Sequence, residues 1–68
     1  MQPSEQWYCL TTTRDYFEAL LMQQRLEAYG ITVILINKLD RSQLAHGFVE
    51  VQVPLEHARL ALEVLESS

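Results

Sequence analysis

The polar stretch 37–47 holds the side chains best suited to binding a ligand. It carries two cations and three side chains able to donate or accept hydrogen bonds, a combination that can hold an anion. The chain has only 2 glycines, so no glycine-rich phosphate cradle accompanies them. A solvated loop of mixed charge is the alternative interpretation, because loops carry variability as well as function. The candidate ligand-binding residues are Asn37, Lys38, Arg41, Ser42 and Gln43.

The two histidines and the single cysteine form no recognisable metal motif. His46 falls in the polar stretch and His57 near the start of an expected helix, with no cluster of Cys or Asp around either. We interpret both as surface histidines rather than as metal ligands or pH sensors. Cys9 lies in an apolar segment, where a cysteine is more often a small buried hydrophobe than a reactive thiol. We therefore expect no metal and no cofactor.

Acid–base catalysis is not favoured by the positions of the carboxylates. Glu56 with Glu63, or Asp40 with His46, can be written as acid–base pairs, but nothing in their spacing requires that they lie close together. A chain of 68 residues also has little room for a pocket of its own. The sequence therefore predicts a protein that is not an enzyme.

Composition excludes further classes of function. Nine acidic residues against five basic ones give a net charge of −4, which argues against a nucleic-acid partner. Aromatic residues at Trp7, Tyr8 and Phe48 would suit base stacking in an RNA-binding module, but no basic stripe accompanies them. Residues 1–6 lack the basic and apolar regions of a signal peptide, and no apolar run approaches the ~20 residues of a membrane span. We expect a cytoplasmic protein without a membrane partner.

The elements that position these side chains are organised around the apolar run Ile31–Ile36. Its β-branched residues predict a short strand buried on both faces. Before it, residues 7–12 predict a first strand whose core face the pattern does not reveal. After it, residues 48–53 alternate strictly, which places three valines towards the helices and Phe48, Glu50 and Gln52 on the opposite face.

Two helices complete the expected fold. The first spans 16–29, with Asp15 as N-cap, Glu18 as its capping-box partner and Gly30 as the terminating residue. The second spans 55–66 after Pro54. The expected core stripe of the first helix is Ala19, Met22, Leu26 and Tyr29, with a second apolar patch at Phe17, Leu21 and Ala28 flanked by Leu20; the expected stripe of the second helix is Leu55, Ala58, Ala61, Leu62 and Leu65.

This order predicts an α+β fold, a ferredoxin-like β-α-β-β-α sandwich that lacks the last strand. The antiparallel sheet has the expected order 1-3-2, with both helices on one face. We assign residues 1–6 to a flexible N-terminus and 7–66 to a single domain. The first strand then has an open edge, and the uncovered sheet face carries apolar residues.

Small size makes oligomerisation the expected source of extra stability. A domain of this length buries only about 60% of the surface of its unfolded chain. One cysteine permits no internal disulfide. We therefore expect a homo-oligomer, either a dimer or a trimer, with room for another protein partner. The candidate interface residues are Ile34, Ile36, Phe48, Tyr8 and Leu10.

The chain resembles a family of small bacterial domains catalogued as prokaryotic signal-transducing proteins, whose function is unknown. The resemblance covers roughly Trp7 to Leu65, and one departure is Tyr16, where many members have proline. The segments that carry it are the aromatic-led strand ending in Thr11–Thr12, Glu18–Leu20, Leu26–Ile31, Val33–Lys38, Asp40, Gly47–Val51, Val53–Pro54 and the leucine-rich last helix.

The resemblance implies a fold similar to that of the PII-type nitrogen regulators, which are trimeric ligand sensors. In that wider fold group the loop between strands two and three carries regulation, and it corresponds here to Asn37–Gly47. The family has no established catalytic residues to carry over, and its signalling label rests on fold analogy. The resulting expectation is a regulatory module that acts by protein–protein interaction. The alternative is a sensor that binds an anionic metabolite or nucleotide between protomers near 37–47.

Overall fold

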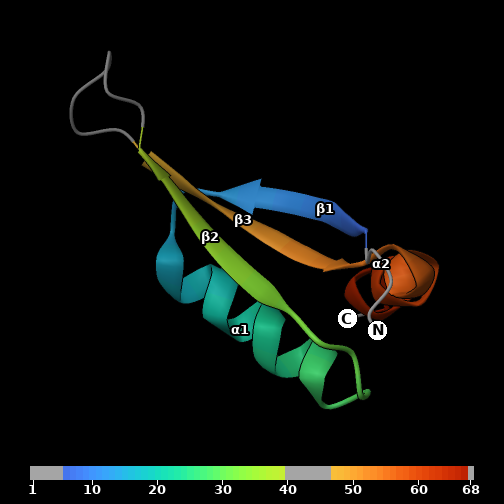
Figure 1. Ribbon diagram of the computed structural model, residues 1–68. Helices are drawn as coiled ribbons and strands as arrows, with labels where there is room; N and C mark the ends of the chain where they lie inside the picture. Colours follow the sequence, from blue (N-terminus) through green and yellow to red (C-terminus); the bar gives the residue numbers. More distant parts are fainter. Residues whose placement is uncertain (1–5, 40–46, 68) are drawn as a thin grey trace.

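The protein is a three-stranded antiparallel sheet with two helices (Figure 1). The computed structural model describes residues 6–39 and 47–67. The strand order β1-β3-β2 agrees with the order predicted from the sequence. The elements are β1 (Trp7–Thr13), α1 (Tyr16–Glu27), β2 (Ile34–Leu39), β3 (Gly47–Pro54), the 3-10 turn η2 (Leu55–His57) and α2 (Ala58–Glu66).

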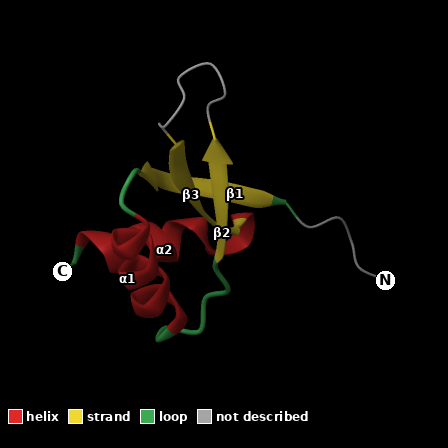
Figure 2. Cartoon of the chain, turned by 90° about the vertical axis from the view of Figure 1, so that its left-hand side faces the viewer, coloured by secondary structure: helices red, strands yellow, loops and turns green. Residues whose placement is uncertain are grey.

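Both helices lie on one side of the sheet and leave the other side uncovered by described residues (Figure 2). The central strand β3 shows the consequence most clearly. Val49, Val51 and Val53 are buried, whereas the alternate residue Phe48 is 37% exposed. The alternation predicted for this strand is confirmed, because each second residue points into the helix layer.

The apolar run before the polar stretch is divided between a connection and a strand. Ile31 and Val33 are buried, but they precede β2, which begins at Ile34. Leu35 lies opposite Val51 and packs against the core, whereas Ile34 is 37% exposed. Within the described chain this strand is therefore buried on one face only, because the helices cover only that face, and the burial of its other face by a partner stays a prediction.

The strand also continues further than predicted. Asn37, Lys38 and Leu39 belong to β2 and pair with Val49, Phe48 and Gly47 of β3. The expected loop over 37–47 is corrected to a shorter connection, whose residues 40–46 lie outside the described part of the chain. Pairing with β3 explains the extension, since each added residue of β2 takes part in the antiparallel pairing of the two strands.

The first strand changes phase at a β-bulge between Cys9 and Thr11. Tyr8, Thr11 and Thr13 lie opposite the three buried valines, so they occupy the helix side of the sheet. Trp7, Cys9 and Thr12 lie opposite Pro54, Gln52 and Glu50 and occupy the uncovered side. Leu10 is the inserted residue and packs against the core. The face of this strand, which the sequence left open, is thereby assigned.

The N-terminus of α1 is capped through an intervening hydroxyl. Asp15 Oδ1 accepts hydrogen bonds from the backbone N–H groups of Phe17 (3.0 Å) and Glu18 (3.4 Å), as predicted. Glu18 does not reach back to the backbone itself. Its Oε1 accepts from Thr13 Oγ1 at 2.7 Å, and Thr13 Oγ1 accepts from the Asp15 N–H at 3.1 Å. Thr13 thus relays the reciprocal half of the capping box.

The C-terminal turn of α1 ends earlier than predicted. Gly30 has a φ of +83°, which suits glycine, and the Ile31 N–H donates to the Leu26 carbonyl at 3.2 Å. Ala19 and Leu26 are buried and Met22 packs against them. Tyr29 is 61% exposed, so its assignment to the core is wrong. The chain has already left the helix there, and Ile31 fills the core position instead.

Helix α2 confirms most of the predicted stripe, since Ala61 is buried and Ala58 and Leu65 pack against the core. Val64 is buried in addition, whereas Leu55 and Leu62 are exposed and were wrongly placed in the core. Leu55 belongs to a 3-10 turn with about 3.0 residues per turn, so it does not continue the stripe of the α-helix that follows. Arg25 Nη2 of α1 donates to the Val64 carbonyl at 3.2 Å and ties the two helices together.

Candidate functional site

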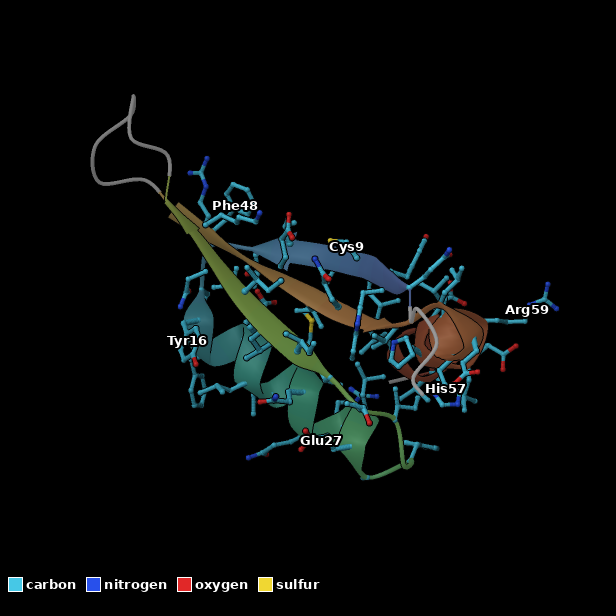
Figure 3. All side chains as sticks on the ribbon, in the orientation of Figure 1. Cys9, Tyr16, Glu27, Phe48, His57 and Arg59 are labelled. Carbon is cyan, nitrogen blue, oxygen red and sulfur yellow. The ribbon has the colours of Figure 1, made fainter. Side chains whose placement is uncertain are left out.

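The uncovered side of the sheet is the main candidate surface. We call it the open sheet face and define it by the register of the three strands. Figure 3 shows Cys9 and Phe48 on this side, away from the helices. Its nine residues are Trp7, Cys9 and Thr12 of β1, Phe48, Glu50 and Gln52 of β3, and Ile34, Ile36 and Lys38 of β2.

Apolar side chains occupy much of the open sheet face. Ile34, Phe48 and Trp7 are each more than a third exposed, and Ile36 is half-buried. Ile34, Ile36 and Phe48 are directly opposite Gln52, Glu50 and Lys38, so the apolar side chains meet one another only as diagonal neighbours about 7–8 Å apart or along one strand. Three of the five predicted interface residues, Ile34, Ile36 and Phe48, thus share this face.

The other two predicted interface residues lie elsewhere. Tyr8 is opposite Val53 on the helix side of the sheet, and Leu10 packs against the core at the bulge. Trp7 and Cys9 occupy the corresponding places on the open sheet face. The alternation of apolar residues along β1 gave no signal for this choice, because both of its faces carry apolar side chains.

The polar residues of the open sheet face are held by one another. Gln52 Nε2 donates to Glu50 Oε1 at 2.8 Å.

Desolvation raises the pKa of the Cys9 thiol, and the Glu50 carboxylate raises it further; a hydrogen bond at Thr11 and the positive charge of Lys38 oppose the shift. The thiol is exposed, which corrects the expectation of a buried cysteine. A raised pKa keeps it protonated and poorly nucleophilic.

The predicted ligand-binding residues do not converge within the described part of the chain. Asn37 lies opposite Val49 and therefore on the helix side of the sheet, whereas Lys38 lies opposite Phe48 on the open sheet face. Arg41, Ser42 and Gln43 lie outside the described residues, as do Asp40 and His46. Of the two described candidates, Lys38 is thus the one on the surface that could receive a ligand.

A hollow at one end of the open sheet face was missed by the sequence prediction. It has a volume of about 590 Å³ and is lined by Thr12, Thr13, Arg14, Phe48 and Glu50. Arg14 directly follows Thr13, the last residue of β1, which pairs with Val49 of β3. One further step along this antiparallel register brings Arg14 opposite Phe48. The strand pairing that brings Arg14 to Phe48 is not visible in the sequence, so no local pattern marked this cation.

The remaining titratable candidates form no obvious catalytic group. His57 is only partly exposed, and its Nδ1 atom is buried without a hydrogen-bond partner among the described residues. Glu56 and Glu63 are both exposed. Within 6–39 and 47–67, no three side chains of His, Cys, Asp or Glu come together as metal ligands. No helix in these ranges has the length and apolarity needed to cross a membrane.

What these residues offer chemically is a binding surface on which apolar side chains alternate with the polar side chains of Glu50, Gln52 and Lys38. Comparison of the chain with family models, with curated proteins and with solved structures found no match.

Proposed function

We propose that this protein is a small non-enzymatic regulatory or signal-transducing module of the ferredoxin-like type, which acts in the cytoplasm by binding protein. Its binding surface is the open sheet face, and its partner there is a second copy of the chain in a dimer or trimer. One observation carries the proposal. Ile34, Phe48 and Trp7 are exposed together on the one side of the sheet that neither helix covers.

The size of this surface determines how strong such a contact can be. Three strands about 4.8 Å apart, with β3 as an 8-residue strand rising about 3.3 Å per residue, give a flat footprint of roughly 370 Å². A standard interface buries about 800 Å² on each partner. The contact should therefore be reversible and depend on concentration, unless the partner also reaches the flanks of the sheet.

Mass in solution, measured by light scattering over a range of concentrations, tests the proposal. We expect the mass to rise from that of the 7.9 kDa monomer as concentration increases. The substitution Ile34→Lys places a charge among the exposed apolar residues of the contact and should keep the chain monomeric, since burying an unpaired charge is costly. Leu60→Lys is the matched control, because Leu60 is a similarly exposed residue on α2.

Two results would contradict this assignment. A wild-type chain that remains monomeric at the highest concentration would exclude self-association. An assembly that persists unchanged in Ile34→Lys, but not in Leu60→Lys, would move the contact from the sheet to the helix layer.

A second candidate function is a sensor of a small anionic molecule. The observation that favours it is Lys38, which stands exposed beside Phe48 with Arg14 at the nearby hollow. A ligand that binds only the native state raises the free energy of unfolding. A thermal shift with an anionic metabolite or nucleotide would support the sensor. An unchanged melting temperature across a broad panel of such compounds would argue against it and favour the protein-interaction module.

A further inference from the structure

The aromatic ring of Phe48 lies between two cationic residues at one end of the open sheet face. Lys38 of β2 is its direct cross-strand partner. Arg14, which follows β1, lines the same hollow as Phe48 on its other side. Because β3 is the central strand, the backbones of the two cationic residues stand about 10 Å apart, two strand spacings, with the ring between them.

Neither cation is neutralised by the described part of the chain. Arg14 and Lys38 are both exposed, and neither forms an ion pair with another described residue. The one carboxylate in the hollow, that of Glu50, already accepts a hydrogen bond from Gln52. Among the described residues, Arg14, Lys38 and Glu50 together give this end of the face an excess of one positive charge, in a chain whose net charge is −4.

The described chain uses a comparable arginine differently. Arg25 donates to the Val64 carbonyl at the end of α2, where a cation stabilises a helix C-terminus. Arg14 and Lys38 have no such structural partner within 6–39 and 47–67. No described contact therefore accounts for either side chain, whereas a negatively charged ligand would use both.

We propose that the hollow beside Phe48 binds a small aromatic anion, a ring that carries a carboxylate or phosphate group. The ring packs against Phe48 in an offset or edge-to-face arrangement. The anionic group takes a charge-assisted hydrogen bond from Arg14, which lines the hollow together with Thr12, and a second from Lys38, which lies outside the lining as the cross-strand partner of Phe48. The hollow has a volume of about 590 Å³ and is open to solvent, so a ligand bound there stays partly exposed. This assignment rests on the second candidate function and specifies its ligand.

A titration followed by amide NMR of the ¹⁵N-labelled chain tests the site, with phenyl phosphate as the probe. We expect saturable shifts at Phe48, Arg14 and Lys38. Inorganic phosphate and benzyl alcohol each supply half of the chemistry, so each should bind more weakly than phenyl phosphate. Benzoate compares the carboxylate with the phosphate, and adenosine monophosphate tests whether a larger ring system is accepted.

Single substitutions locate the binding energy. Arg14→Gln and Lys38→Gln should each weaken the binding of phenyl phosphate about two- to fivefold, the effect of an exposed charge. Glu50→Gln should strengthen it by a similar factor, because it removes the nearby negative charge. Arg59→Gln is the control, since Arg59 lies on α2 and points away from the sheet (Figure 3). The spectrum of each variant also shows whether the chain remains folded.

The possible outcomes distinguish a failure of this binding site from a failure of the proposed sensor function. The absence of shifts around Phe48 at ten-millimolar probe, or equal binding of benzyl alcohol, would overturn the site. Unchanged affinity in both Arg14→Gln and Lys38→Gln would overturn it as well. A thermal shift with some anion whose NMR contacts lie elsewhere would leave the sensor standing and remove this site alone.

Discussion

The hydroxyl relay at the start of α1 gives the sharpest prediction about stability. In Thr13→Val the side chain keeps its shape and its β-branch, but the hydroxyl is lost. Two hydrogen bonds disappear with it, the one donated to Glu18 at 2.7 Å and the one accepted from the Asp15 N–H at 3.1 Å. The change therefore isolates the relay from packing and from strand propensity.

The magnitude follows from the exposure of these groups. Each hydrogen bond contributes about 0.5–1.5 kcal/mol, and water can replace part of both at this exposed site. We expect the free energy of unfolding to fall by about 1 kcal/mol, a large share of the ~3–5 kcal/mol available to a domain of this size. The melting temperature should fall by roughly 4–8 °C.

Urea and thermal unfolding followed by far-UV circular dichroism provide the assay. Thr12→Val is the matched control, since Thr12 neighbours Thr13 and its hydroxyl makes no hydrogen bond to another described residue. The control should change stability by less than about 0.5 kcal/mol. Adding Glu18→Ala to each variant completes a double-mutant cycle for the pair Thr13 and Glu18. Equal stability of Thr13→Val and Thr12→Val would refute the relay.

Two further predictions concern the core and the thiol. Val51→Ala should lower the free energy of unfolding by about 2 kcal/mol, because Val51 is fully buried in the central strand and a cavity would remain; Ile34→Ala, on the exposed side, should cost much less in the same urea assay, and equal costs would contradict the face assignment. Alkylation of Cys9 by iodoacetamide should rise with pH only above the range of an ordinary cysteine, since its pKa is raised. Glu50→Gln should move this profile to lower pH and Lys38→Gln to higher pH; no response to either would contradict the charges assigned to this face.

Local patterns were sufficient for the order and pairing of the elements. The capping Asp15, the terminating Gly30 and the alternation of Val49, Val51 and Val53 are each determined within a few residues of sequence. The order of the strands then follows from general rules for short connections.

The errors arise where one residue or one turn interrupts the regular period of a strand or helix. The inserted Leu10 reverses the alternation of β1, and the 3-10 turn at Leu55–His57 takes Leu55 out of the core stripe of α2. Both effects depend on packing between segments that are far apart in the sequence. Such packing cannot be read from the hydrophobic periodicity of a single strand or helix. The hollow at Phe48 was missed for the same reason, since Arg14 reaches it only through the pairing of β1 with β3.

The described core contains only aliphatic side chains, and this has a consequence for optical spectroscopy. All six aromatic residues are exposed to solvent, although aromatic rings usually dominate protein interiors. Trp7, the single tryptophan, lies on the open sheet face with 36% of its surface exposed, so its emission should respond to whatever covers that face. The native chain thus carries its own fluorescent reporter of binding.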